Sequence, residues 1–272
     1  MGTRQSMPEA RNIEKLKSFL EIIKNSNPDA LHYACSMWSF TFNHIYQADE
    51  QVPRSDQCDA IPYVPLIPET FNCRLSEESV FLDIGCLGGY GMFDFVTRRK
   101  RQALCVPKMI GLDLPFESVV LGKLMAEHWI ENNETVNFIQ GSACALPLES
   151  KSCDLITSRL VLPYVSSISA ALQEIGRVLR KEGLVCLQTH SFKYYINNLR
   201  NRQQQWRRSI YYLRPLLSGS FLAITGRQAP GRRFRETAMS ANLLTRSVKK
   251  FGLQPVDQIG FDTKPIVVLR KC

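Results

Sequence analysis

The chain has 272 residues, of which 44% are hydrophobic, and its net charge is +9. This length suits one elaborated domain with a substantial core. No apolar run of about eighteen residues occurs, which argues against a membrane-spanning protein. The nine cysteines form no Cys-x-x-Cys pair, which argues against a disulfide framework or a zinc site. We therefore expect a cytoplasmic protein with reduced cysteines and no bound metal.

Two helices are predicted ahead of the first strand. Apolar residues recur at helical spacing over 11–25, and a second helix over 30–47 is crowded with aromatic side chains and contains His44. Residues 48–70 carry four prolines and are expected to form a linker or lid loop. The aromatic side chains either fold over a ligand or pack this region on the sheet, and both readings stay open.

An apolar strand followed by a glycine-rich turn is the most informative feature of the chain. Residues 80–90 read VFLDIGCLGGY, with a strand expected over 79–84. Glycine lets the backbone turn tightly and lets a ligand approach where a Cβ would collide. A second strand over 108–114 carries Asp113 near its end, where a carboxylate can accept the hydroxyls of a ribose. This pair of strands predicts a nucleotide-like ligand at the carboxyl edge of a sheet.

Strands and helices alternate along the rest of the chain. We expect helices over 116–131, 170–180 and 239–250, and strands over 135–140, 153–158, 184–190, 253–260 and 264–270. Such alternation implies an α/β fold with a doubly wound, mostly parallel sheet and right-handed crossovers. Residues 1–75 would then form N-terminal helices and a lid loop, ahead of a main domain over 76–272.

The positive charge is concentrated in one segment. Between Lys193 and Lys250 the sequence has thirteen cations and one acid, Glu236, so the rest of the chain is net negative. Residues 192–238 read as a basic helical cap inserted beside the active site, in which Pro215 is expected to kink or end the helix. Such a cap suits an anionic acceptor, an anionic membrane surface or RNA phosphates, and a solvated arginine face is the plain alternative.

The series of segments over 79–190 resembles the class I S-adenosylmethionine-dependent methyltransferases, especially the branch that acts on small molecules and lipids. The resemblance implies a Rossmann-like, seven-stranded sheet whose last strand lies antiparallel beside the fifth. It also implies S-adenosylmethionine as the cofactor. The positions that it assigns to cofactor binding are Asp83, Gly85, Cys86, Leu87, Gly89, Asp113, Leu114, Ser142, Ala143, Ser158 and Arg159.

Two positions depart from the pattern of this family. Leu87 stands where the family has a glycine, and we expect its side chain to narrow the methionine end of the pocket. Ser142 stands where the family often has an acid that binds the adenine amino group, and a hydroxyl accepts a weaker hydrogen bond than a carboxylate. Together they support a non-catalytic, methyltransferase-like binding protein as one alternative.

Three side chains are candidates for proton transfer. Methyl transfer mainly needs a positioned acceptor, and a general base only where the acceptor must lose a proton. His190 ends the fifth predicted strand, and histidine titrates in a suitable range, but a structural role at the strand end is the other reading and is slightly favoured. Tyr164 follows the fourth strand, and His44 lies on the N-terminal helix that would reach the site.

The function predicted from these features is methyl transfer to a small-molecule or lipid- or sugar-linked acceptor, with oxygen favoured over nitrogen and carbon. The acceptor is expected to be anionic or to lie at a membrane that the basic cap contacts. An RNA methyltransferase is the second alternative, but residues 158–161 read SRLV instead of the Asn-Pro-Pro-Tyr turn that many base-amino methyltransferases carry. A dehydrogenase would leave the third, fourth and fifth strands unexplained.

Overall fold

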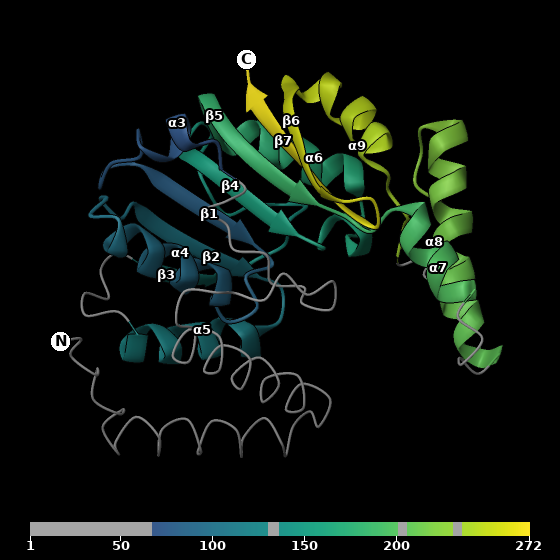
Figure 1. The fold of residues 1–272 in the computed structure, drawn as a ribbon, viewed down its shortest axis with the longest axis horizontal. Coiled ribbons are helices and arrows are strands. Elements are labelled where there is room, and N and C mark those ends of the chain that lie inside the picture. The colour runs from purple at the N-terminus through teal and green to yellow at the C-terminus, as the bar shows by residue number, and fades with distance from the viewer. Residues whose placement is uncertain (1–66, 130–135, 201–205, 231–235) are drawn as a thin grey trace.

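The structure is a computed structural model that describes residues 67–129, 136–200, 206–230 and 236–272 (Figure 1). Within these residues a seven-stranded sheet runs in the order β3-β2-β1-β4-β5-β7-β6. Its strands are β1 (Val80–Ile84), β2 (Lys108–Asp113), β3 (Val136–Gln140), β4 (Cys153–Arg159), β5 (Leu179–Gln188), β6 (Leu253–Phe261) and β7 (Lys264–Lys271).

The five strands β1 to β5 run parallel, and β7 pairs antiparallel with both β5 and β6. The chain order reverses at the β1–β4 pair, which makes the carboxyl ends of these two strands the switch point where α/β sheets bind ligands. The predicted α/β class, the seven strands and the antiparallel last strand are confirmed.

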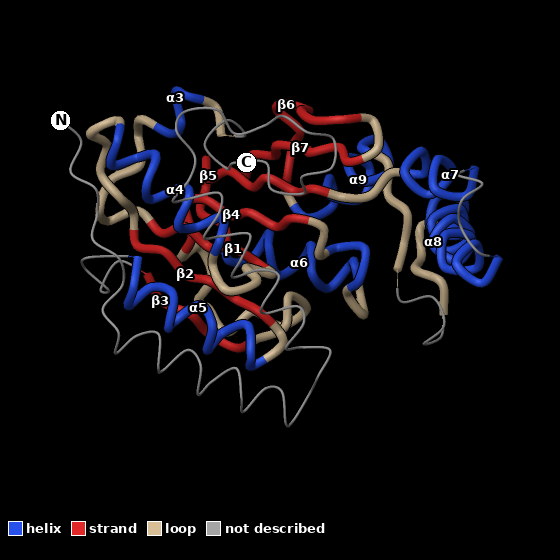
Figure 2. The backbone as a smooth tube through the Cα atoms, turned by 60° about the horizontal axis from the view of Figure 1, so that its bottom comes forward, coloured by secondary structure: helices blue, strands red, loops and turns tan. Residues whose placement is uncertain are grey.

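Helices cover both faces of the sheet, so the parallel strands are buried on both sides (Figure 2). One core packs side chains of α4 and α5 against the sheet, and the other packs side chains of α6 and α9 against the opposite face. The helices are α3 (Glu69–Asn72), α4 (Tyr90–Arg101), α5 (Phe116–Trp129), α6 (Ile168–Val178), α7 (Phe192–Arg200), α8 (Trp206–Thr225) and α9 (Ala241–Val248), with 3-10 turns η3 (Leu162–Tyr164) and η4 (Lys249–Phe251).

A buried arginine on α4 fixes the segment that leads into the sheet. Arg99 is fully buried, and its guanidinium donates to the Asn72 carbonyl at 2.7 Å, to Asn72 Oδ1 at 2.6 Å and to the Leu75 carbonyl at 3.0 Å. It also donates to the carbonyl of Cys105. One side chain thus donates to carbonyl groups in the segment before β1 and in the segment before β2. A buried charge needs such partners, because burying it without them is costly.

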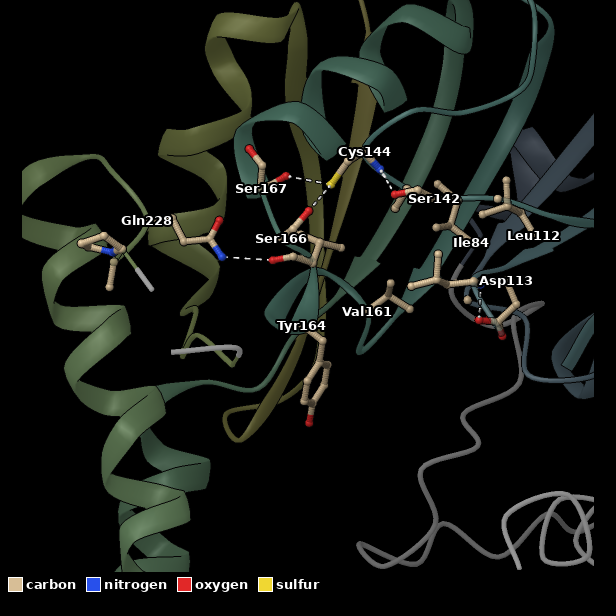
Figure 3. Close-up of a pocket in the computed structure, with 17 residues that line it drawn as sticks. Ile84, Leu112, Asp113, Ser142, Cys144, Val161, Tyr164, Ser166, Ser167 and Gln228 are labelled. Atoms are coloured by element: carbon tan, nitrogen blue, oxygen red, sulfur yellow. Dashed lines mark hydrogen bonds between the residues drawn. The ribbon is translucent and has the colours of Figure 1, made fainter. Parts of the chain in front are cut away.

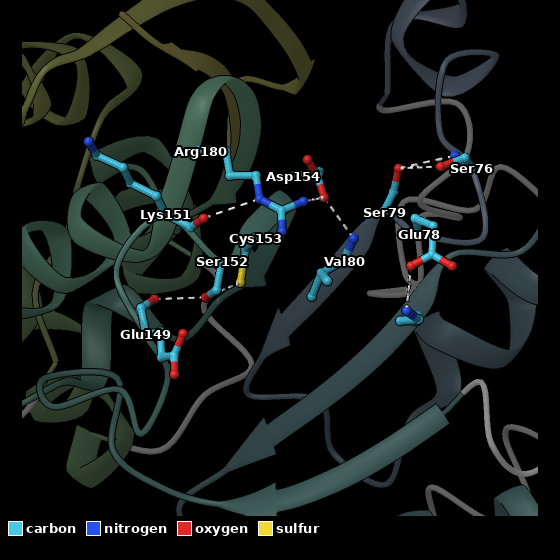
Figure 4. A network of polar contacts seen from close by, with 11 residues as sticks. Ser76, Glu78, Ser79, Val80, Glu149, Lys151, Ser152, Cys153, Asp154 and Arg180 are labelled. Atoms are coloured by element: carbon cyan, nitrogen blue, oxygen red, sulfur yellow. Dashed lines mark hydrogen bonds and ion pairs between the residues drawn. The ribbon is translucent and has the colours of Figure 1, made fainter.

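The fifth strand begins earlier than predicted. Leu179 already pairs with Cys153, and the ladder resumes where Leu184 pairs with Leu155, so residues 180–183 bulge out of the sheet. Arg180 on this bulge contacts Asp154 Oδ2 at 2.6 Å, and the same oxygen accepts the Val80 amide at 2.8 Å (Figure 4). These contacts lie at the amino ends of the strands.

The inserted segment forms two helices that lie side by side and project beyond the sheet in both views (Figures 1 and 2). Pro215 lies inside α8, which continues to Thr225, so of the two expected effects the proline does not end the helix. The proline is buried, and its carbonyl accepts the Ala238 amide at 3.0 Å. This contact ties α8 to the segment after the helix and holds it in place although proline has no N–H to donate within the helix.

Several predictions on the N-terminal part lie outside the described residues. These are the helices over 11–25 and 30–47, with His44, and the loop over 48–70 up to residue 66. The end of that loop is described, and there α3 forms a single helical turn. Across the described ranges, no helix combines the length and the apolar character that crossing a bilayer requires.

Candidate functional site

A pocket of about 850 Å³ opens at the carboxyl ends of β1, β2 and β4, within the size range of small-molecule sites. Figure 3 shows Asp113 and Gln228 on opposite sides of this pocket, with Tyr164 between them. The residues that line it are Ile84, Gly85, Leu112, Asp113, Leu114, Gly141, Ser142, Ala143, Cys144, Val161, Tyr164, Val165, Ser166, Ser167, Gln228, Ala229 and Pro230.

The glycine-rich turn after β1 forms the floor of the pocket and starts α4. Gly85 and Gly89 have φ of 74° and 87°, and a Cβ on Gly89 would lie 2.5 Å from Phe138 Cζ. The Gly85 amide donates to the Leu112 carbonyl at 2.7 Å, which ties the turn to β2. A Cβ on Gly85 would lie 2.1 Å from Val161 Cγ2, so backbone conformation and space both favour glycine at the two positions.

Leu87 adopts the left-handed conformation that the family gives to glycine, with φ of 50°. Its amide donates to Asp113 Oδ2 at 2.9 Å, so the turn depends on the carboxylate at the end of the next strand. The Leu87 side chain is 37% exposed and is not among the described residues that line the pocket. The structure therefore does not support the expected narrowing of the pocket by Leu87.

Asp113 is a buried carboxylate with acceptor capacity to spare. Its Oδ1 accepts the Leu114 amide at 2.8 Å, and the Ser118 hydroxyl also donates to it. Two carboxylate oxygens offer about four acceptor positions, so at least one remains for a ligand hydroxyl. Burial raises the pKa of Asp113, although the three donors act in the opposite direction. The side chain thus meets the requirements of the ribose site predicted from the sequence.

Ser142 and Ala143 border the pocket as predicted. Ser142 Oγ accepts the Cys144 amide at 3.2 Å, and Cys144 Sγ donates to the Ser167 carbonyl at 3.3 Å. A serine hydroxyl that accepts one hydrogen bond still has its own proton to donate. Ser142 therefore suits a ring nitrogen acceptor better than an amino group.

Besides Leu87 and Gly89, four predicted cofactor residues are not among the described residues that line the pocket. Asp83 is buried and accepts the Thr157 hydroxyl at 2.7 Å, which ties β1 to β4. Cys86 is buried in the core beside α4 and α5, and burial raises the pKa of its thiol well above the ordinary value. Ser158 is buried and Arg159 half-buried at the end of β4. These four residues are placed to support the pocket, and the pocket-lining set does not include them.

Glu236 links two residues that the sequence singled out separately. Its Oε1 accepts the hydroxyls of Tyr164 at 2.7 Å and Tyr195 at 2.5 Å, and it lies 3.6 Å from His190 Nδ1. Burial acts to raise the pKa of Glu236, but the surrounding His190, Tyr195 and Tyr164 outweigh it and hold that pKa below its usual range. The carboxylate is therefore ionised at neutral pH. Burial and this carboxylate raise the pKa of Tyr164, which stays a neutral phenol.

His190 itself is buried and does not line the pocket. Its ring stacks on Tyr194, with centroids 4.0 Å apart and planes inclined by 5°. Tyr164 lines the pocket and donates to Glu236, which lies beside His190. Among the described residues, these contacts connect His190 to the pocket through the Glu236 carboxylate. Sequence reasoning missed Glu236, and the available signal was its position as the single acid in a strongly basic segment.

The end of the inserted segment closes the far wall of the pocket. The Gln228 side chain accepts the Ile168 amide at 2.9 Å and donates to the Val165 carbonyl at 3.0 Å. It thereby fixes Ala229 and Pro230 against the loop that follows β4. Within the described part of the insertion, this short connection after α8 lines the pocket, and Glu236 contacts Tyr164 on the pocket wall. Among the described residues, no cluster of three or more His, Cys, Asp or Glu side chains forms a metal site.

Comparisons with known proteins agree with this geometry. The family described as "Methyltransferase domain" matches residues 82–187. An uncharacterized methyltransferase of Bacillus subtilis, YcgJ, is 29% identical over 167 residues, which cover 58% of this chain and 62% of that protein. A demethylmenaquinone methyltransferase of Lactococcus lactis is 31% identical over 102 residues, covering 34% of this chain and 40% of its own length. The matches thus span less than two thirds of these relatives.

Solved structures share the fold at low sequence identity. An S-adenosylmethionine-dependent methyltransferase from Methanosarcina mazei superposes with a TM-score of 0.53 at 16% identity, covering 79% of this chain and 99% of its own. A geranyl diphosphate C-methyltransferase from Streptomyces coelicolor, crystallised with S-adenosyl-L-homocysteine, gives a TM-score of 0.52 at 13% identity, covering 75% and 74%. The motif order, the sheet and the family match agree: residues 82–187 match the methyltransferase domain, and the fold around them is shared with S-adenosylmethionine-dependent methyltransferases.

Proposed function

We propose that the protein transfers a methyl group from S-adenosylmethionine to a hydroxyl oxygen of a small-molecule or lipid-linked acceptor. The observation that carries the choice of oxygen is the Tyr164 hydroxyl on the pocket wall, which donates to the ionised Glu236 carboxylate at 2.7 Å. An acceptor hydroxyl must lose a proton, and this pair offers a place for it.

The residues at the β1–β2 side of the pocket fit the cofactor. Asp113 keeps acceptor capacity for a ribose hydroxyl, Leu114 lies exposed beside it for an adenine face, and the Gly85 turn leaves room for the methionine part. The bound cofactor supplies an activated methyl group. The remaining work of the protein is to position the acceptor and to receive its proton.

The proton transfer balances without any further reactant. As the acceptor oxygen forms its bond to the methyl group, its O–H becomes strongly acidic. The proton passes to Tyr164 Oη while the Tyr164 proton passes to Glu236 Oε1, so Tyr164 is neutral before and after the step. A carboxylate with a low pKa is a sufficient base here, because the proton is lost from a cationic oxygen and not from a free alcohol.

The relatives do not decide the acceptor. One relative is a demethylmenaquinone methyltransferase and one structural neighbour is a geranyl diphosphate C-methyltransferase, which methylates carbon. The choice for this chain therefore rests on its own residues.

The test supplies the full chain with methyl-labelled S-adenosylmethionine and an extract of metabolites and lipids, and identifies labelled products by mass spectrometry and NMR. An O-methyl product is expected. Label on carbon or nitrogen would contradict the oxygen assignment. No labelled product in spite of measured cofactor binding would favour the non-catalytic alternative.

Two variants then test the relay on the identified acceptor. Tyr164→Phe and Glu236→Gln should each lower kcat roughly 100-fold or more with unchanged cofactor affinity. Tyr195→Phe is the matched control, because it removes a hydroxyl from the same carboxylate but on a buried side chain outside the pocket-lining set. Equal losses in all three variants would mean that the cluster is only structural.

A further inference from the structure

The outer face of α8 carries large apolar side chains exposed to solvent. Leu213, Leu217, Phe221 and Ile224 are 48%, 54%, 40% and 84% exposed. At about 100° per residue their spacing places them within an arc of about 80°. At about 1.5 Å per residue the stripe is about 16 Å long. These four residues are called the outer stripe below.

The opposite face of α8 holds the helix to the domain through small residues. Ser218 is buried, with its Oγ 2.8 Å from Thr237 Oγ1, and a Cβ on Gly219 would lie 2.4 Å from the Ala238 carbonyl oxygen. This face also buries Leu222, which is 6% exposed, so α8 is anchored by one large apolar side chain as well as by small ones, while the large side chains of the outer stripe stay exposed. Packing within the described fold does not explain the outer stripe, and such patches mark contact surfaces.

Charge indicates what the stripe contacts. Residues 192–235 contain ten Lys and Arg residues and no acid. Arg214, one residue from the start of the stripe, and Arg227, just beyond the end of α8, are both exposed. The stripe therefore combines apolar side chains with neighbouring cations. An anionic bilayer is complementary to this combination, because its negative headgroups lie directly above its hydrocarbon.

We propose that α8 lies in the interface of an anionic membrane, with the outer stripe at the acyl boundary and Arg214 and Arg227 at the headgroups. This inference stands independently of the chemistry proposed above. Gln228, Ala229 and Pro230 follow α8 directly and line the pocket, so contact at α8 would bring the pocket close to the bilayer. If the proposed function holds, the acceptor then reaches the pocket from the membrane.

The test measures flotation of the full chain with vesicles of phosphatidylcholine alone and with vesicles that also contain phosphatidylglycerol. Binding is expected to the anionic vesicles only. Leu217→Ser with Ile224→Ser should weaken it by at least about tenfold, because both side chains leave the acyl boundary. Arg214→Gln and Arg227→Gln should each weaken it about fivefold. Val256→Ser, at a 44% exposed valine on β6, is the matched control and should bind like the wild type.

Four results would overturn the inference. Failure of the wild type to float with anionic vesicles would remove the membrane contact, and equal flotation with neutral vesicles would remove the role of charge. Wild-type binding by the Leu217→Ser, Ile224→Ser protein would remove the role of the stripe. Sedimentation velocity covers the fourth case: self-association of the wild type that the double variant abolishes, without vesicle binding, would assign the stripe to a contact between copies. Circular dichroism confirms that each variant is folded, and methyl transfer is not needed for any readout.

Discussion

Replacing Asp113 with asparagine separates the ligand role of this carboxylate from its structural role. Asparagine keeps the shape of the side chain but turns one oxygen into a donor. Removing the charged acceptor of a ribose hydroxyl weakens ligand binding by about 1.5 to 3 kcal/mol, or roughly 10- to 150-fold in Kd. We expect Asp113→Asn to bind S-adenosylhomocysteine more weakly by this factor in calorimetric titration.

The stability of the ligand-free protein should change much less than the affinity. The Leu87 and Leu114 amides each donate to one Asp113 oxygen, so the asparagine amide leaves one of them facing a donor, at a cost of about 1 to 3 kcal/mol. An opposing effect comes from burial, which raises the pKa of Asp113 above its unfolded value. Stability from such a group is present below the unfolded pKa and lost as pH rises through the folded one. At neutral pH the buried charge therefore destabilises the fold, and a neutral amide recovers part of the loss.

Asp154→Asn is the control for this experiment. Asp154 also accepts a backbone amide, from Val80, but it lies at the amino ends of the strands beside Arg180 (Figure 4). Its asparagine variant should bind S-adenosylhomocysteine like the wild type. Unchanged affinity in Asp113→Asn, or an equal loss in Asp154→Asn, would refute the ribose assignment.

Three further predictions concern the fold and its pH dependence. Gly89→Ala should lose about 2 kcal/mol or more in urea unfolding, because φ of 87° is strained for alanine and the new Cβ would meet Phe138; an unchanged midpoint would contradict this reading. Arg99→Leu should lose at least about 3 kcal/mol, because buried carbonyls lose a charged donor, and a stable variant would show that water or repacking replaces it. Glu236, whose folded pKa is lowered, stabilises the protein above roughly pH 4.3 and stops doing so as the pH falls through the folded value. The stability difference between the wild type and Glu236→Gln should therefore shrink in acid, and a difference that grows there would reverse the assigned sign.

The strand series was predictable from sequence because buried parallel strands read as short apolar runs with turns at both ends. The prediction for β5 missed its start, since Leu179 joins the ladder across a bulge that leaves no mark in the pattern. The sequence left open whether Pro215 kinks or ends the helix, because a contact that holds α8 at this position comes from Ala238, more than twenty residues further along the chain.

The candidate site divides in the same way. Asp113 and the Gly85 turn follow from local motifs, and the structure places both on the pocket. Glu236 does not, because its importance comes from three partners in other elements, Tyr164, Tyr195 and His190, that only the folded chain brings together. Local sequence patterns indicate turns and strand ends well. A polar cluster assembled from distant segments has no local sequence pattern by which it could be predicted.

The left-handed conformation of Leu87 has a consequence for ligand affinity. Leu160, just after β4, shares this conformation with φ of 57°, so non-glycine residues in a disfavoured region follow two neighbouring strands at the ligand-binding edge. Each holds on the order of 1 kcal/mol or more of conformational energy that the surrounding fold must maintain. The Leu87 amide donates to Asp113, so if this carboxylate also binds a ribose hydroxyl as we propose, ligand binding and the retention of this strain are coupled through one side chain. Leu87→Gly would remove the conformational strain without removing any side chain that contacts the ligand. The turn after β1 would then be less rigid, so ligand affinity depends on the rigidity of this turn as well as on its contacts.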